Sequence, residues 1–123
     1  MTAKKILIIE DNPENMKLMA DVLTAQGFDV LKANEGLAGI EILKQNSKET
    51  GLVLLDLKLP DISGLEVLKT IKSAEATREI PVIVVSAHAM EADITATKQA
   101  GCTDYFTKPI NIVEFLTKVR TYV

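Results

Sequence analysis

Polar residues able to bind or accept phosphate stand directly after several short apolar runs of the sequence. These residues are Glu10, Asp11, Asp56, Ser86 and Lys108. Carboxylates brought close together repel one another by an energy on the order of a few kcal/mol per pair, so a cluster of them requires a proton or a cation. Mg²⁺ prefers such oxygen ligands. With a lysine and a hydroxyl group nearby, an aspartate in this setting can receive a phosphoryl group.

The order of the secondary structure elements decides whether these residues meet. Short aliphatic and β-branched runs alternate with segments of helical periodicity, which indicates an α/β fold. Strands are predicted over Lys5–Ile9, Phe28–Ala33, Leu52–Leu55, Val82–Val85 and Asp104–Thr107. The first helix is predicted to begin at Pro13, with Asn12 as its cap, and to stop at Gly27. Three further helices are predicted over Leu37–Lys44, Leu65–Lys72 and Met90–Ala100. Asn111 is expected to cap a last helix, whose apolar face is formed by Ile112, Phe115, Leu116 and Val119. The expected architecture is a doubly wound, five-stranded parallel sheet with strand order 2-1-3-4-5.

Ligands of such sheets bind beyond the carboxyl ends of the strands, where the strand order reverses. The first and third strands are neighbours in the expected order, so Glu10, Asp11 and Asp56 should share one crevice. Taken singly, the residues have plainer explanations: Asp11 could cap the next helix, and Lys108 could be a solvated loop residue. These candidate residues stand at the ends of four predicted strands, all on the same edge of the sheet. Their placement together favours a binding site over the plainer explanations.

Composition limits the possible classes of function. With 123 residues, of which 47% are apolar and 25% charged, the chain is expected to form one soluble domain over residues 1–123. Its apolar runs are far shorter than the roughly 18 residues of a membrane span, and no signal peptide is recognised. A net charge of −3 and an aromatic content of 4% argue against direct nucleic-acid binding. The single cysteine, Cys102, excludes an internal disulfide, so a cytoplasmic location is expected.

In combination, these motifs resemble the receiver domain of two-component response regulators. The resemblance covers essentially the whole chain and rests on Glu10-Asp11-Asn12, the segment from Asp56 to Gly64 (DLKLPDISG), Ser86-Ala87 and Lys108-Pro109. It is strongest to the stand-alone CheY-like and DivK-like response regulators, although the pair Asn12 and Asn15 also resembles receivers inside hybrid histidine kinases. The resemblance implies a (βα)5 fold of the flavodoxin and CheY type, and a single receiver domain over residues 1–123.

The resemblance also implies the chemistry of the site. Asp56 would accept a phosphoryl group from the phosphohistidine of a histidine kinase or a histidine phosphotransfer protein. Glu10, Asp11 and Asp56 would hold Mg²⁺ together with the backbone carbonyl of Lys58. Lys108 would bind phosphoryl oxygens, as would the hydroxyl group of Ser86.

Further positions carry regulatory roles in the family. Ala87 would leave room for the phosphoryl group, Tyr105 would be the aromatic switch, and Pro109 would follow a cis peptide bond. Lys58 and His88 stand at positions that tune the lifetime of the phosphoryl group. Phosphorylation would then change the affinity of the face built from the fourth helix, the fifth strand and the fifth helix for a target protein.

Other functions remain as alternatives at this stage. The chain could be the receiver segment of a hybrid histidine kinase or of a longer response regulator. An aspartate-based phosphatase of the haloacid dehalogenase type would need an acidic residue at position 58 as its general acid. Lys58 stands there instead, and a lysine cannot take that role near neutral pH. A flavodoxin-like carrier of FMN would need an acid-free phosphate loop after the first strand, where Glu10-Asp11-Asn12 stands. The expected activity is therefore that of a signalling phosphoacceptor, limited as an enzyme to self-phosphorylation and slow autodephosphorylation.

Overall fold

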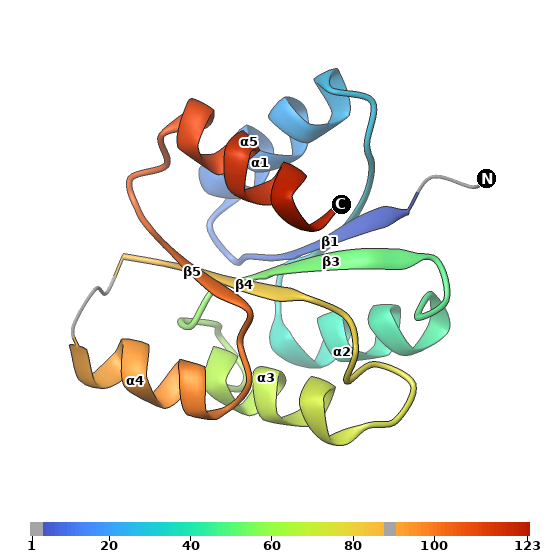
Figure 1. Ribbon diagram of the computed structural model, residues 1–123, viewed down its shortest axis with the longest axis vertical. Helices are drawn as coiled ribbons and strands as arrows, with labels where there is room; N and C mark the ends of the chain where they lie inside the picture. The colour runs from blue at the N-terminus through green and yellow to red at the C-terminus, as the bar shows by residue number, and fades with distance from the viewer. Residues whose placement is uncertain (1–3, 88–90) are drawn as a thin grey trace.

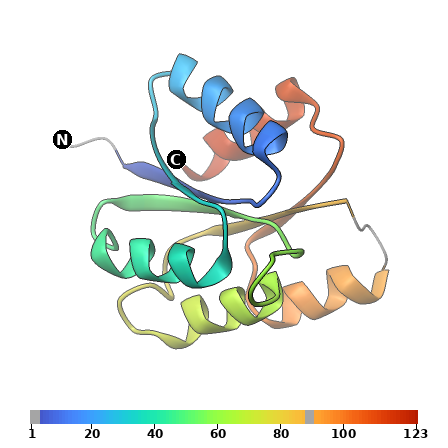
Figure 2. The same cartoon turned by 180° about the vertical axis from the view of Figure 1, so that it is seen from behind.

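A parallel sheet lies between two layers of helices in the computed structural model, which describes residues 4–87 and 91–123 (Figures 1 and 2). The strands are β1 (Lys5–Ile9), β2 (Asp29–Ala33), β3 (Thr50–Leu55), β4 (Val82–Ser86) and β5 (Asp104–Thr107). The helices are α1 (Pro13–Ala25), α2 (Gly36–Gln45), α3 (Gly64–Ser73), α4 (Glu91–Gln99) and α5 (Ile112–Tyr122). The five strands pair in parallel in the order β2-β1-β3-β4-β5, which confirms the predicted fold class.

The two faces of the sheet have separate apolar cores. Helices α1 and α5 cover one face, and α2, α3 and α4 cover the other (Figure 1). Strand β1 contributes to both, because successive side chains of a strand point to opposite faces. Ile6 and Ile8 pack in the core under α1 and α5, whereas Leu7 and Ile9 pack in the core above α2 and α3. A fully buried central strand explains the uninterrupted apolar run at this point of the sequence.

Helix ends follow the predicted capping signals. The side chain of Asn12 accepts a hydrogen bond from the backbone N–H of Asn15 at 3.0 Å, directly before Pro13 at the first position of α1. Asn111 caps α5 in the same way. Gly27 follows α1 with a φ of 90°, a left-handed conformation that favours glycine. Asp11 was the other possible cap of α1, and the structure gives that role to Asn12.

Strand boundaries differ slightly from the prediction. β3 begins at Thr50 rather than at Leu52, because Lys5 of β1 pairs with Thr50 before the register shifts at Ile6. β2 begins one residue later than predicted, and β4 extends through Ser86. Met90, the predicted start of the fourth helix, lies outside the described residues.

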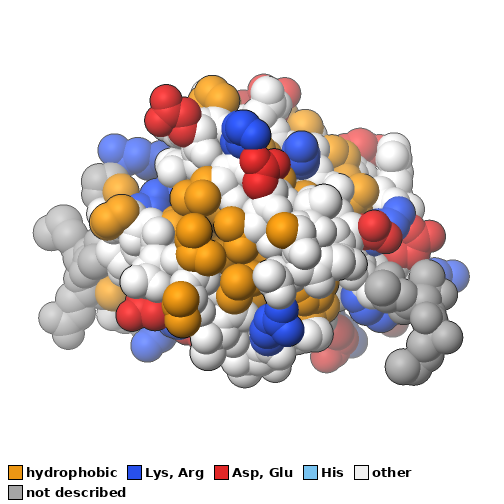
Figure 3. Space-filling model, turned by 90° about the horizontal axis from the view of Figure 1, so that it is seen from above, with side chains coloured by type: hydrophobic (Ala, Val, Ile, Leu, Met, Phe, Trp, Pro, Cys, Tyr) orange, Lys and Arg blue, Asp and Glu red, His pale blue; other side chains and the backbone are white. Residues whose placement is uncertain are grey.

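Two large apolar residues of the predicted helices are exposed. Leu37 is 59% exposed, because the buried face of α2 runs through Gly36, Gly39 and Leu43 and Leu37 lies beside it. Ile112 is 45% exposed in the first turn of α5, one turn before the buried Phe115. Apolar side chains also gather near the middle of the face that α1 and α5 present (Figure 3).

Among the described residues, none of the helices combines the length and the apolar composition needed to cross a lipid bilayer.

Candidate functional site

Three carboxylates converge where β1 and β3 end. Because Ile9 pairs with Leu55, the next residues of these strands, Glu10 and Asp56, lie side by side. Glu10, Asp11 and Asp56 each offer an oxygen atom within 4.8 Å of the others, as the strand order predicted. Glu10 is 1% exposed and Asp56 is buried, whereas Asp11 is exposed at the rim of the site.

Lys108 joins two of these carboxylates. Its Nζ lies 2.6 Å from Oε1 of Glu10 and 2.9 Å from Oδ2 of Asp56. The lysine follows β5, and its backbone N–H donates to the carbonyl oxygen of Ser86 at 2.9 Å. The peptide bond between Lys108 and Pro109 is cis, the form expected from the resemblance. A single ammonium group thus bridges the acidic residues from the opposite side of the site.

Burial and contact shift the proton affinities of this cluster. Burial raises the pKa of Glu10 to about 7, assisted by its hydrogen bond with Asp56 and opposed by that with Lys108. Burial lowers the pKa of Lys108, but its hydrogen bonds to Glu10 and Asp56 outweigh this effect and raise the pKa overall. The lysine therefore stays charged at neutral pH, while Glu10 is close to the midpoint of its titration when no cation is present.

An open cleft of about 460 Å³ contains most of the predicted site residues. Within the cleft, the backbone N–H of Lys58 donates to Oδ1 of Asp56 at 3.1 Å. Its lining includes Asp11, Asp56, Lys58, Ser86, Ala87 and Lys108. The buried Ser86 and the exposed Ala87 come from the end of β4.

Of the predicted site residues that the structure describes, Glu10, Tyr105 and Pro109 do not line this cleft. Tyr105 on β5 is half-buried and packs against the core on the α2, α3 and α4 side of the sheet. His88 lies outside the described residues.

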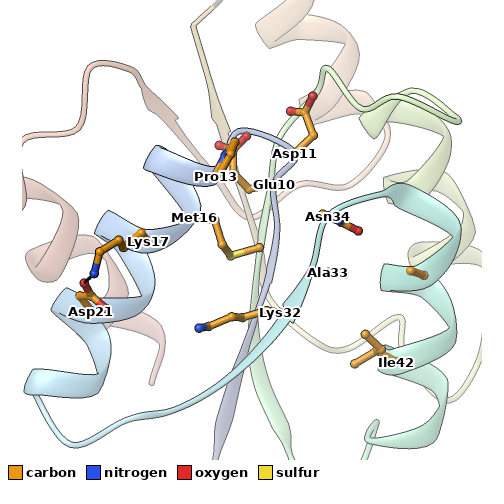
Figure 4. A pocket seen from close by; sticks show the side chains of 11 residues that line it. Glu10, Asp11, Pro13, Met16, Lys17, Asp21, Lys32, Ala33, Asn34 and Ile42 are labelled. Atoms are coloured by element: carbon orange, nitrogen blue, oxygen red, sulfur yellow. Dashed lines mark hydrogen bonds and ion pairs between the residues drawn. The ribbon is translucent and has the colours of Figure 1, made fainter.

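A second cavity of about 720 Å³ adjoins the acidic cluster (Figure 4). It shares Glu10, Asp11 and Pro13 with the site and extends between α1 and α2, where Lys32 and Met16 contribute to its lining. Figure 4 shows Glu10 and Asp11 at one end of this cavity, so the acidic cluster can be reached from two sides.

Two contacts of the site region were not predicted from the sequence. One is the ion pair between Glu10 and Lys108. The other involves Asp61, whose Oδ1 and Oδ2 accept hydrogen bonds from the backbone N–H groups of Gly36 and Leu37, each at 2.8 Å. These bonds, chiefly the one from Leu37, lower the pKa of Asp61. The sequence holds an indirect signal for this contact. Glu35 occupies the N-cap position of α2, and because glutamate is a poor helix cap, the first N–H groups of the helix need a partner from elsewhere.

The donor chemistry of the cluster fits a hard divalent cation. Carboxylate oxygens are the preferred protein ligands of Mg²⁺, and the three here lie near enough to one another to share an ion. In the part of the chain that the structure describes, Lys108 is the one lysine in contact with them, so their negative charge exceeds the positive charge that it supplies. The arrangement can therefore bind a divalent cation next to the Asp56 carboxylate, with Lys108 and Ser86 beside it.

Comparison with known proteins gives consistent matches over nearly the whole chain. The family model described as the response regulator receiver domain matches residues 6–120. The polar-differentiation response regulator DivK of Brucella ovis is 38% identical over 120 residues, which cover 98% of this chain and 96% of that protein.

Solved structures agree with these matches. The phosphorylated cyanobacterial phytochrome response regulator RcpA has a TM-score of 0.84 at 31% identity, with 98% of this chain and 91% of that chain covered. The receiver domain of the sensor histidine kinase PA1611 from Pseudomonas aeruginosa PAO1 was solved with a magnesium ion coordinated in its active site cleft. It has a TM-score of 0.89 at 26% identity, with 98% of both chains covered.

The raised pKa of Glu10 predicts a specific pH dependence of stability in the absence of metal. A carboxyl group with a pKa of about 7 when folded and 4.5 when unfolded binds its proton more tightly in the folded state. The protonated group therefore contributes on the order of 3 kcal/mol to the free energy of unfolding. This contribution is complete below about pH 4.5 and is lost as the pH rises through 7. In EDTA, urea unfolding from pH 5 to 8 should therefore show a loss of stability in wild type that Glu10→Gln lacks.

The variant Glu41→Gln, which removes an exposed glutamate of α2, controls for the loss of a negative charge. Parallel pH profiles for wild type and Glu10→Gln would show that Glu10 does not titrate as inferred.

Proposed function

Because the chain belongs to the response regulator receiver domain family, and so to two-component signalling, we propose that Asp56 accepts a phosphoryl group. A histidine kinase or a histidine phosphotransfer protein is the proposed donor. The observation that carries this proposal is the position of the Asp56 carboxylate, which lies in an open cleft 2.9 Å from Nζ of Lys108 and beside Glu10 and Asp11. The same chemistry holds whether the chain acts alone or as the receiver segment of a longer protein.

In the proposed transfer, a carboxylate oxygen of Asp56 forms a bond to phosphorus while the bond between phosphorus and the imidazole nitrogen of the donor breaks. The electron pair of the broken bond returns to the imidazole. Lys108 and the hydroxyl group of Ser86 line the same cleft and would contact the phosphoryl oxygens. Ala87 also lines the cleft, and its small side chain would leave space for the group beside them.

Glu10, Asp11, Asp56 and the backbone carbonyl of Lys58 are the proposed ligands of Mg²⁺. The carboxylates supply the oxygen chemistry that this ion requires, and the magnesium in the related PA1611 receiver supports the assignment. When bound, the ion would neutralise negative charge on the phosphoryl oxygens. Glu10 must lose its proton to act as a ligand, so cation binding should favour its ionised form.

The proposed output is a changed affinity for a protein target. Ser86 and Tyr105 lie on adjacent strands and face the same side of the sheet, because Tyr105 pairs with Val84 in the register of β4 and β5. A shift of the Ser86 hydroxyl toward the phosphoryl group would let Tyr105 move inward and alter the face formed by α4, β5 and α5. Lys58 and His88 would set the lifetime of the modification, which ends by slow autodephosphorylation.

Acetyl phosphate with Mg²⁺ should add one phosphoryl group to the wild-type chain, because the site itself supplies the charge stabilisation that the transfer needs. Intact mass spectrometry should show the added group in wild type and in the control Asp21→Asn, which alters an exposed aspartate of α1. Asp56→Asn should remain unmodified, and EDTA should prevent the reaction. Equal labelling of wild type and Asp56→Asn would place the acceptor elsewhere.

Ser86 should control the response of Tyr105. The sequence has two tyrosines and no tryptophan. In a Tyr122→Phe variant, the tyrosine fluorescence therefore comes from Tyr105. Beryllofluoride with Mg²⁺ should reduce acrylamide quenching of Tyr105, and Ser86→Ala should lose most of this change while still binding beryllofluoride at Asp56.

Ser73→Ala, at the C-terminal end of α3, is the matched control and should respond as the parent does. If Ser86→Ala keeps the full change in quenching, the proposed coupling between Ser86 and Tyr105 does not operate.

A further inference from the structure

The N-terminus of α2 is capped by a residue from a different part of the chain. Glu35 occupies the N-cap position but its side chain makes no capping hydrogen bond. The first two N–H groups of the helix, those of Gly36 and Leu37, instead donate to the two carboxylate oxygens of Asp61 at 2.8 Å each. A carboxylate is well suited to this place, because the N-terminus of a helix carries partial positive charge and unpaired N–H groups.

These bonds attach the loop between β3 and α3, residues 56–63, to α2 (Figure 2). Ile62 strengthens the attachment by packing against Gly36 so closely that a Cβ atom there would lie 2.7 Å from Cγ1 of Ile62. The far end of the loop is fixed at Gly64, whose N–H donates to the carbonyl oxygen of Leu57 at 2.8 Å. A Cβ atom on Gly64 would lie 2.2 Å from the carbonyl oxygen of Asp56. The loop is thus held at Asp61 and Ile62 and again at Gly64.

Lys58 lies in this loop between Asp56 and the Asp61 anchor, and its N–H already contacts Oδ1 of Asp56. We propose that Asp61 is a positioning residue for the cation site: by binding the N-terminus of α2, it holds the loop so that the Lys58 backbone stays beside Asp56. This inference rests on the proposed function, in which the Lys58 carbonyl is a ligand of Mg²⁺. Asp61 itself would contact neither the ion nor the phosphoryl group.

The first test measures Mg²⁺ binding by isothermal titration calorimetry with magnesium chloride alone. Asp61→Ala should weaken the affinity about tenfold, as expected when a residue that supports a ligand is removed. Asp61→Asn should weaken it less, because the amide oxygen can still accept one of the two hydrogen bonds. Asp21→Ala removes a carboxylate from α1 that is paired with Lys17, and this control should bind as wild type does.

A second variant separates positioning of the loop from simple stabilisation of α2. Glu35→Ser, introduced into Asp61→Ala, supplies a serine at the N-cap position and should restore helix capping without restoring the link to the loop. The melting temperature should recover, whereas the Mg²⁺ affinity should stay low. If the double variant recovers both properties, or if Asp61→Ala binds Mg²⁺ as wild type does, the positioning role is contradicted.

Hydrogen exchange of the metal-free protein supplies a readout that does not depend on the ion. The amides of Lys58 and Gly64 should exchange faster in Asp61→Ala and in the double variant than in wild type. Unchanged exchange at both amides would overturn the inference. A wild-type protein that binds no Mg²⁺ would contradict the proposed cation site instead, and the exchange rates would still decide whether Asp61 anchors the loop.

Discussion

Mutual repulsion among Glu10, Asp11 and Asp56 governs the arrangement of the groups around them. Their oxygens lie within 4.8 Å of one another, and two of the three residues are buried. Lys108 relieves part of this repulsion by contacting Glu10 and Asp56, and the raised pKa of Glu10, which comes chiefly from burial, lets this residue take up a proton near neutral pH. Charge crowding of this kind is tolerated only where the rest of the fold supports it, and its donor chemistry fits a divalent cation.

The support comes from the central strands. β1 is buried on both faces by two separate cores and pairs with β3, which holds the residues that follow these two strands side by side. Ser86 and Lys108 arrive from the next two strands, and a backbone hydrogen bond between them fixes their spacing. Glu10, Asp56, Ser86 and Lys108 thus each lie at the end of a strand or directly after it, and the loop after Asp56 is held by hydrogen bonds of Asp61 and Gly64.

The sequence was sufficient to predict the strand order and the convergence of Glu10, Asp11 and Asp56, because both depend on hydrophobic periodicity and on the rules of parallel sheets. The sequence did not predict the ion pair between Lys108 and Glu10, since that contact depends on side-chain conformation and on the burial of Glu10. The exposure of Leu37 cannot be predicted from the sequence pattern, because two buried glycines, which carry no hydrophobic signal, form the inner face of α2 with Leu43. Local patterns thus determine the elements, while contacts between distant side chains require the folded structure.

A crystal structure of the protein with Mg²⁺ and beryllofluoride tests most directly whether Asp56 is the phosphoacceptor. Beryllium should be bonded to a carboxylate oxygen of Asp56, with the cation held by Glu10, Asp11, Asp56 and the carbonyl of Lys58. Nζ of Lys108 should have left Glu10 to contact a fluorine atom. Beryllofluoride bound at another residue, or Lys108 still joined to Glu10 with the cleft empty, would contradict the proposed chemistry.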